Sequence, residues 1–391
     1  MKYNFDEVII RESTHSVKYD LREKIFGQDD IIPMWVADMD FATPDFIREA
    51  VKERADHPVY GYSIRPQVYF DSIRNWQEKH HHWKIKNDWI RFSPGIVPAV
   101  NLCVQAFTRP GDKIIVQPPV YFPFFSAIKN NKRIQLDNPL KLQNGRLSMD
   151  FDDLRSKIDK HTRMILLCSP HNPGGSVWRK EELQELAGIC IEHGILIVSD
   201  EIHCDLVFPP NKHIPTATLS GEIADQTISC IAPSKTFNLA GMATSSVIVS
   251  NDSLAKRFDE TMEQLHVGGG NLFGTIASIA AYTKGDEWLQ ELLDYLQENA
   301  RLAVEFINHK VRGIQTWLPE STYMLWLDCR ELDMEDEELW NFFIRQAGLG
   351  FNKGQMFGQG GEGFMRLNFA CPRQILMRAL HQLAEAVNGE A

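Results

Sequence analysis

The middle of the chain alternates short apolar runs with longer segments whose apolar positions recur every three to four residues. The first pattern is typical of strands buried on both faces, and the second is typical of amphipathic helices. The predicted strands are residues 113–117, 164–168, 195–199, 227–231 and 246–250. Helices are expected between them, for example at residues 98–107 and 180–193. This order predicts an α/β fold with a mostly parallel sheet covered by helices.

The pattern changes after about residue 285. We expect a long helix at residues 287–310, a strand near 322–328 and further helices near 336–346 and 374–387. The first 40 residues show little periodicity and are expected to pack against this C-terminal part. We therefore expect two domains, a large one from residues 45–285 and a smaller, discontinuous α+β one from residues 1–44 and 286–391.

Composition narrows the classes of function. The net charge of -11 argues against a nucleic-acid-binding surface, which needs a basic excess. No apolar run approaches the roughly 20 residues that span a membrane, and the first 30 residues lack the apolar core of a secretion signal. We expect a cytoplasmic protein with no membrane association. The seven cysteines are odd in number and include no Cys-x-x-Cys pair, so most are expected to be buried thiols.

Three consecutive histidines, His80, His81 and His82, raise the question of a metal site. They lie in a polar helical stretch, where consecutive side chains point to different faces. Metal ligands are usually spaced so that they meet on one side. We therefore favour a structural role for these histidines and expect no bound metal.

Candidate chemistry gathers at the ends of the predicted strands, where α/β sheets bind their ligands. Gly95, Ile96 and Val97 open a predicted helix, whose free N–H groups and positive dipole end suit a phosphate. A plain helix start has the same pattern. Tyr121 lies in a proline-rich loop after a strand. Its ring could stack on a flat ligand or belong to the core.

Two more features follow later strands. Asn172 lies in a stiff turn of proline and glycine residues and could offer its amide to a ligand oxygen or serve only the turn. Asp200 ends one strand and Lys235 follows the next. An aspartate can keep a pyridine nitrogen protonated, and a lysine can form an imine with an aldehyde. These are the requirements of pyridoxal phosphate (PLP), although a buried Asp–Lys ion pair is an alternative.

The motifs around these residues resemble those of known enzymes. Fold-type I PLP enzymes carry motifs similar to Pro170-His171-Asn172-Pro173-Gly174-Gly175, Ser199-Asp200-Glu201-Ile202-His203 and Ser234-Lys235-Thr236-Phe237-Asn238-Leu239-Ala240-Gly241. The MalY/PatB family of cystathionine β-lyases carries motifs similar to Ile32-Pro33-Met34-Trp35-Val36-Ala37-Asp38-Met39-Asp40-Phe41 and Arg366-Leu367-Asn368-Phe369-Ala370-Cys371-Pro372-Arg373. The resemblance extends over nearly the whole chain.

The resemblance implies one set of residues that binds the cofactor and another that binds the substrate. The cofactor set is Gly95, Ile96, Val97, Tyr121, Asn172, Asp200, His203, Ser234 and Lys235, with Tyr62 reaching the phosphate of the neighbouring subunit in a homodimer. The set for the substrate carboxylate is Arg366, Asn172 and Ala37. Lys235 is implied to be the Schiff-base lysine and the general base, assisted by Tyr121.

Two positions depart from the related aminotransferases. Ala243 stands where an arginine usually holds the phosphate, and His203 stands where a tyrosine is usual. Both departures agree with the lyase group. We therefore expect a PLP-dependent carbon–sulfur β-lyase that cleaves cystathionine or other L-cysteine S-conjugates to a thiol, pyruvate and ammonia. The alternatives are a class I/II aminotransferase and a PLP-binding regulatory protein that acts through a protein partner.

Overall fold

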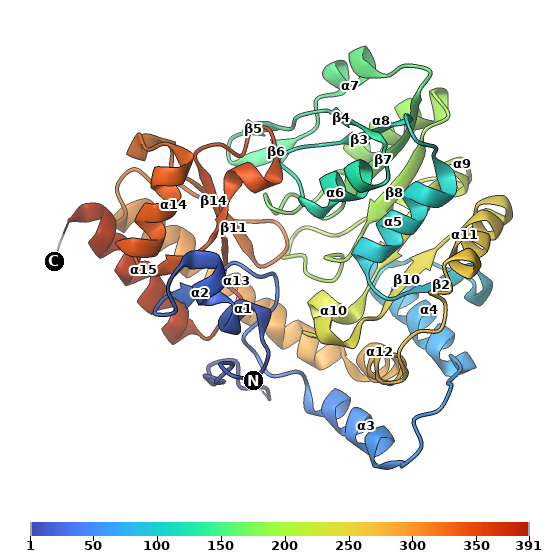
Figure 1. Ribbon diagram of the computed structural model, residues 1–391, viewed down its shortest axis with the longest axis horizontal. Helices are drawn as coiled ribbons and strands as arrows, with labels where there is room; N and C mark the ends of the chain where they lie inside the picture. The colour runs from blue at the N-terminus through green and yellow to red at the C-terminus, as the bar shows by residue number, and fades with distance from the viewer. Residues whose placement is uncertain (1, 390–391) are drawn as a thin grey trace.

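The computed structural model describes residues 2–389 and is built around a seven-stranded sheet (Figure 1). From one edge to the other the strands are β2 (Ile90–Ser93), β10 (Ser245–Ile248), β9 (Thr227–Ile231), β8 (Leu196–Asp200), β7 (Thr162–Cys168), β3 (Lys113–Val116) and β4 (Ile134–Asp137). β10 runs antiparallel to both of its neighbours, and the other neighbouring pairs are parallel. The predicted α/β fold is confirmed.

Helices cover both faces of the sheet, because alternate residues of a strand point to opposite sides. Leu166 and Val198 belong to one apolar layer, and their neighbours Leu167 and Ile197 belong to the other. The first layer includes helices α5 (Ile96–Phe107), α6 (Pro123–Asn130) and α11 (Asp252–Gln264). The second includes α7 (Phe151–Lys157) and α8 (Lys180–Glu192). Burial on both faces explains why these strands are apolar throughout.

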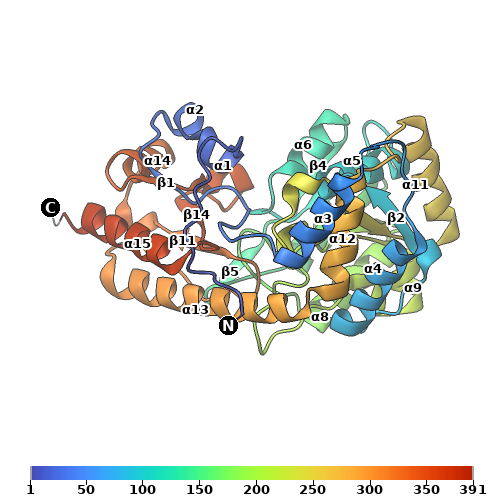
Figure 2. The same cartoon turned by 90° about the horizontal axis from the view of Figure 1, so that it is seen from below.

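Three further helices lie side by side near the β2 edge of the sheet, as Figure 2 shows. They are α3 (Asp45–Asp56), α4 (Gln67–His81) and α12 (Leu272–Lys284). The histidines at the end of α4 have separate partners: His80 contacts Asp286 at 2.8 Å, and His81 contacts Asp205 at 2.7 Å. These contacts agree with the structural role favoured for them.

The C-terminal part is a smaller layer of strands and helices. Its sheet has the order β11 (Met324–Asp328), β14 (Phe364–Asn368) and β13 (Asn352–Lys353), and its helices are α13 (Asp286–Lys310), α14 (Asp336–Arg345) and α15 (Arg373–Asn388). The N-terminal segment joins it, since β1 (Ile32–Pro33) pairs with β12 (Leu349–Gly350). The short helices α1 (Val17–Asp20) and α2 (Arg22–Phe26) lie beside it (Figure 2). The proposed division into domains stays a prediction.

Short elements connect these layers. They are β5 (Lys141–Gln143), β6 (Arg146–Ser148), α9 (Gly221–Asp225) and α10 (Pro233–Thr236). The edge strand β4 is absent from the predicted set because it is largely exposed, with Ile134 at 49%. The glycine-rich stretch at residues 354–363 begins with a short 3-10 helix at Gly354–Phe357.

The cysteines and the helices both bear on the character of the whole protein. All seven cysteines are free and buried, which confirms the prediction of buried thiols. Among residues 2–389, no helix combines the length and the apolar composition needed to cross a membrane.

Candidate active site

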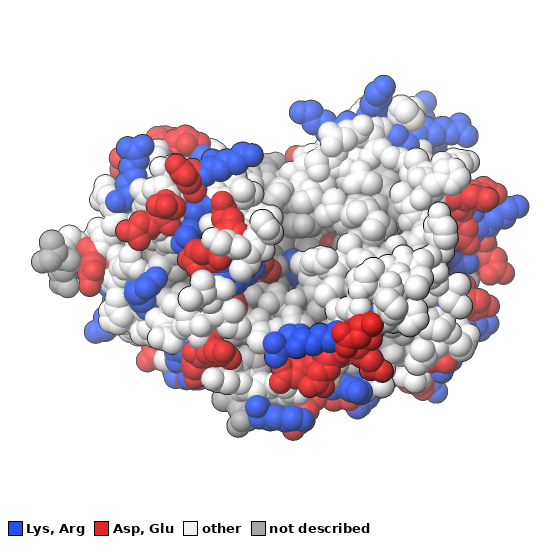
Figure 3. Space-filling model, turned by 60° about the horizontal axis from the view of Figure 1, so that its bottom comes forward, with Lys and Arg blue, Asp and Glu red and all other residues white. Residues whose placement is uncertain are grey.

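A cavity of about 190 Å³ opens at the carboxyl ends of the parallel strands. The residues that line it are Ala37, Gly95, Ile96, Val97, Pro98, Tyr121, Cys168, Asn172, Asp200, Ile202, His203, Ser234, Lys235 and Ala240. Strands β7, β8 and β9 are parallel neighbours, so the loops that follow them meet at one edge of the sheet. The face in Figure 3 is hollowed between the C-terminal part on the left and the large sheet region on the right.

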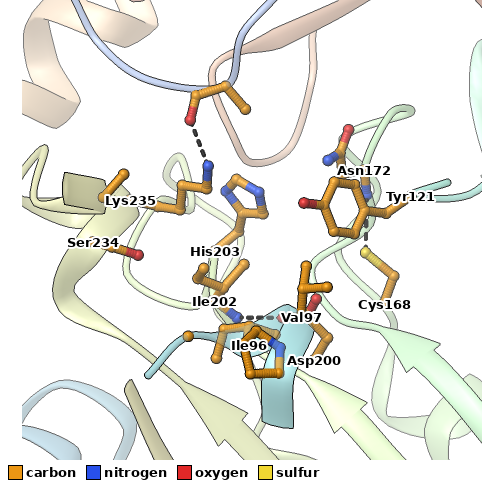
Figure 4. Close-up of a pocket in the computed structure, with 14 residues that line it drawn as sticks. Ile96, Val97, Tyr121, Cys168, Asn172, Asp200, Ile202, His203, Ser234 and Lys235 are labelled. Carbon is orange, nitrogen blue, oxygen red and sulfur yellow. Dashed lines mark hydrogen bonds between the residues drawn. The ribbon is translucent and has the colours of Figure 1, made fainter. Parts of the chain in front are cut away.

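Lys235 enters the cavity from α10, directly after β9. Its amine donates a hydrogen bond to the carbonyl oxygen of Ala37, the dashed line at the top of Figure 4. Burial lowers the pKa of Lys235 to about 8, while the charge of Asp38 opposes that shift. An amine with this pKa is neutral in about a tenth of molecules at pH 7, far more than an ordinary lysine, so it can act as a nucleophile or base.

Asp200 ends β8 on the opposite side of the cavity floor from Lys235 (Figure 4). One carboxylate oxygen accepts a hydrogen bond from the backbone N–H of Ile202 at 3.1 Å. Burial raises the pKa of Asp200 to about 7, against the opposing effects of that hydrogen bond and of Lys235. A cationic ring nitrogen placed beside it would return the carboxyl to its charged form.

His203 lies between Lys235 and Tyr121 in Figure 4 and is buried. Burial lowers the pKa of its imidazole well below the usual value, and the charges of Lys235 and Arg366 add to this effect. Among the described residues, its Nδ1 atom has no hydrogen-bond partner. Buried polar atoms are almost always paired, so a neutral ring with an open nitrogen is suited to a polar ligand group.

The N-terminus of α5 forms the floor of the cavity. Gly95 is the N-cap residue, and Ile96 and Val97 begin the helix. The first N–H groups of a helix have no partners within it and carry the positive end of its dipole, which suits a phosphate. Ser234 lines the cavity from the side of Lys235 (Figure 4).

Arg366 lies in β14 and reaches the cavity through Asn172. Its guanidinium donates to the amide oxygen of Asn172 at 3.0 Å, to the side chain of Asn352 at 2.6 Å and to the carbonyl of Trp35 at 2.8 Å. It also lies 5.0 Å from the centre of the Phe357 ring. Burial lowers the pKa of Arg366 to about 10, and its Nε atom has no partner within the described residues. An open donor on a fixed arginine is suited to a carboxylate.

The contact between Arg366 and Asn172 has a second consequence. Because the amide oxygen of Asn172 accepts from Arg366, its NH₂ group can donate towards the cavity. Tyr121 and Asn172 lie on the same side of the cavity in Figure 4. Burial raises the pKa of Tyr121 to about 12, so its phenol stays protonated and its ring remains available for stacking.

The structure brings together all the predicted site residues of one chain except Tyr62. Tyr62 is fully exposed in the segment between α3 and α4 and lies outside the cavity. This agrees with a residue that serves another subunit, and that role stays a prediction. Ala243, the position that departs from the aminotransferases, also lies outside the set that lines the cavity.

Sequence reasoning missed other residues of the site. Pro98, Cys168, Ile202 and Ala240 line the cavity, and each lies within or next to a motif that was recognised. Asn352 holds Arg366 from a two-residue strand in which nothing in the pattern of residues indicated a function.

Comparison with known proteins adds independent findings. The family described as aminotransferase class I and II matches residues 29–383. Cystathionine beta-lyase PatB of Bacillus subtilis (strain 168) is 41% identical over 98% of this chain and 100% of its own length. Protein MalY of Escherichia coli (strain K12) is 31% identical over 98% of this chain and 99% of its own length.

A solved structure of a PLP-containing protein is also similar to this chain. Cystalysin from Treponema denticola, which contains a pyridoxal 5'-phosphate cofactor, superimposes with a TM-score of 0.97. The two sequences are 35% identical over 100% of each chain. The chain therefore belongs to the class I and II aminotransferase family and, within it, to the group of PatB and MalY.

Proposed function

We propose that the protein is a PLP-dependent carbon–sulfur β-lyase that releases a thiol, pyruvate and ammonia from cystathionine or a related L-cysteine S-conjugate. The name of PatB, a cystathionine beta-lyase, supports the activity. The pyridoxal 5'-phosphate in the cystalysin structure supports the cofactor. The observation that carries the proposal is the position of Lys235: a half-buried, weakly basic amine shares one cavity with Asp200 and with the Asn172–Arg366 pair.

The residues of the cavity fit each part of PLP. The N-terminus of α5 and Ser234 would hold the phosphate, and the Tyr121 ring would lie against the pyridine. The Asp200 carboxylate would pair with the ring nitrogen, and the Asn172 amide with the ring oxygen. Bound PLP supplies an aldehyde for the substrate amine and a ring that accepts the electron pair released at the α-carbon.

The chain's own groups would carry the remaining steps. Arg366 binds the substrate α-carboxylate through its open donor and fixes the direction of the Cα–H bond. The freed amine of Lys235 removes the α-proton as the general base. Asp200 holds a negative charge beside the ring nitrogen, which favours charge withdrawal from the α-carbon. Loss of the β-thiolate and hydrolysis then give pyruvate and ammonia.

The decisive assay uses cystathionine as the only substrate. A β-lyase releases pyruvate continuously, with one thiol and one ammonia for each pyruvate. An aminotransferase stops after about one turnover because it needs a keto-acid acceptor. Absence of pyruvate, with conversion of cystathionine to its corresponding keto acid only after an acceptor keto acid is added, would contradict the proposal and support the aminotransferase alternative.

We also propose a homodimer with shared active sites. An exposed apolar segment supports it: between α3 and α4 the exposed residues include Val59, Tyr60, Tyr62 and Ile64. Contiguous apolar surface of this kind marks an interface in many proteins. Light scattering should give twice the mass of the 44.8 kDa chain, and Tyr62→Ala should weaken PLP binding. A monomer that retains full activity would contradict it.

We also propose that the chain is divided into two domains. Residues 45–285 would form the large domain and residues 1–44 with 286–391 the small one, and the β1–β12 pairing supports this grouping. We also propose a cytoplasmic location, for which the buried, unpaired thiols are the support.

A further inference from the structure

The segment of residues 35–41 connects the N-terminal part to the reactive groups of the cavity. The Ala37 carbonyl accepts hydrogen bonds from the Lys235 amine and, at 3.0 Å, from the Tyr323 hydroxyl. Two positions earlier, the Trp35 carbonyl accepts from Arg366 at 2.8 Å. The position of this segment therefore sets where the lysine amine and the arginine rest.

Two cationic side chains from the N-terminal side, Arg11 and Lys18, contact two carboxylates of the same segment. Arg11 contacts Asp38 at 2.6 Å and Asp40 at 2.6 Å, and it also donates to the Met39 carbonyl at 3.3 Å. Lys18 contacts Asp40 at 2.8 Å and Asp38 at 3.8 Å. The two cations and two anions form a neutral group, which we call the N-terminal ion cluster (Arg11, Lys18, Asp38 and Asp40).

This cluster is unusually buried. The side chain of Lys18 is 1% exposed, that of Asp40 is 6% exposed, and Arg11 and Asp38 are each 18% exposed. Buried ion pairs often stabilise a fold less than apolar residues of the same volume, because each charge loses its hydration. A requirement for stability alone therefore does not explain the cluster well.

The segment already has other attachments. Asn238 accepts from the Met39 N–H and donates to the carbonyls of Met39 and Phe41. Asn368 donates to the carbonyls of Val36 and Asp38 at 2.7 Å each. These uncharged bonds fix the backbone without the ions, so the charges of the cluster have a separate consequence.

That consequence concerns Lys235. The charge of Asp38 acts on the Lys235 amine and favours its protonated form. Arg11 is the cation that contacts Asp38 most closely and compensates its charge. We propose that Arg11, anchored beside Lys18, is a positioning residue of the active site: it pairs with the Asp38 carboxylate and compensates the charge of Asp38 where the segment of residues 35–41 meets Lys235.

None of the other charged groups around Lys235 that are named below compensates the charge of Asp38. The titratable and charged side chains that share its surroundings are Asp38, Tyr121, Asp200, His203, Tyr323 and Arg366. Arg366 is the cation among them, and its contacts are with Asn172, Asn352 and the Trp35 carbonyl. Loss of Arg11 leaves Asp38 with the more distant Lys18, at 3.8 Å, and therefore exposes Lys235 to more of the charge of Asp38.

The test measures the titration of Lys235 directly. The full-length, cofactor-free chain is treated with a trace of an amine-acylating reagent over a series of pH values, and acylation of the Lys235 peptide is quantified by mass spectrometry. In Arg11→Gln the midpoint should rise by roughly half a pH unit or more. Arg11→Lys, which keeps the charge, should stay near the wild type. In the PLP-loaded protein, the acid limb of kcat/KM should move in the same direction.

Arg146→Gln is the matched control. Arg146 also joins two carboxylates, Glu182 and Glu320, and its side chain is 24% exposed, close to the 18% of Arg11. It lies outside the set of residues that line the cavity. It should lower stability without moving the midpoint of Lys235. An Arg11→Gln midpoint equal to that of Arg146→Gln would overturn the proposal.

Asp38→Asn keeps the proposal testable if Arg11→Gln does not fold. It should lower the Lys235 midpoint, and adding Asp38→Asn to Arg11→Gln should cancel the upward shift. An unchanged midpoint in Asp38→Asn would also overturn the proposal.

The inference rests on the proposed function, because it takes Lys235 as the reactive lysine, but the two can fail separately. A wild-type Lys235 that titrates as an ordinary lysine tells against the proposed function, whereas a low wild-type midpoint that ignores Arg11 tells against this inference alone.

Discussion

Asp200 and Asp205 are both buried carboxylates on one short stretch of chain, yet their surroundings differ. Asp205 accepts hydrogen bonds from His81 at 2.7 Å, Trp76 at 3.0 Å and Thr236 at 2.8 Å. Burial raises its pKa, but these bonds outweigh burial and lower the pKa of Asp205 to about 2. Asp200 has one backbone bond, and its pKa is raised to about 7.

The surroundings of Asp205 stabilise the fold, whereas the surroundings of Asp200 are suited to binding a ligand. Around Asp205 each donor has its acceptor, and Thr236, next to Lys235, is fixed by the same carboxylate. Around Asp200 the cavity includes His203 with an open nitrogen, and Arg366 nearby has an open Nε. Buried groups without partners cost free energy, so they point to a bound molecule that supplies the partners.

The largest expected effect is on kcat, after a substitution in the cavity that includes Asp200. Lys235→Ala should lower kcat for pyruvate release by at least about 10⁴-fold, because it removes both the cofactor anchor and the base. The visible absorbance of lysine-linked PLP should also be lost. Lys256→Ala, at an exposed lysine with 78% of its side chain accessible, is the control and should retain wild-type values. Appreciable turnover by Lys235→Ala would show that another residue is the base.

Substitutions in the region around Asp205 should lower the free energy of unfolding. Asp205→Ala leaves the donors of His81, Trp76 and Thr236 without an acceptor, so the free energy of unfolding should fall by about 3 kcal/mol or more. Urea unfolding of the PLP-loaded protein measures this change. Asp205→Asn retains an acceptor oxygen and should lose less. A change in Asp205→Ala of under about 1 kcal/mol would remove the distinction between the two regions.

Asp200→Asn should give the opposite result in the cofactor-free chain. A carboxyl whose pKa is raised on folding, here from 3.8 to about 7, stabilises the fold fully below its unfolded pKa. That contribution is lost as the pH rises through the folded pKa. At pH 8 the neutral amide should therefore raise the free energy of unfolding by about 2 kcal/mol. PLP affinity should fall, since the ring nitrogen loses its partner. A destabilised Asp200→Asn at pH 8 would contradict this.

The smallest effect is a dependence on pH. Lys235 acts as a base only when it is neutral, so kcat should rise with pH and level off above its pKa of about 8. Below that value kcat should fall about tenfold for each pH unit. Stopped assays over a pH series would measure the limb, and its midpoint should not move in Asp205→Asn. A flat profile below pH 8 would mean that another step limits the rate.

The sequence was sufficient to predict the central strands because they are buried on both faces and therefore apolar throughout. Strand β9 was predicted with its observed bounds, and Asp200 and Lys235 were placed at one sheet edge by the order of the strands alone. The edge strand β4 could not be found in this way, because its side chains are largely exposed.

Part of the site was also beyond prediction. Asn352 and Arg11 act through contacts between segments far apart in the sequence, and neither lies in a recognisable motif. Lys18 resembles any surface lysine in the sequence, yet its side chain is 1% exposed. Such residues become visible only when the fold has brought their partners together.

The seven buried thiols have a consequence for an enzyme that makes thiols. Each turnover of the proposed reaction sets free a soft sulfur nucleophile beside the protein. Cys168, which lines the cavity, is buried, and burial raises the pKa of its thiol well above the usual range. The remaining cysteines are buried elsewhere in the fold. A mixed disulfide would require exchange with an oxidised, disulfide form of the product, and the raised pKa of Cys168 leaves little thiolate in the cavity to attack it.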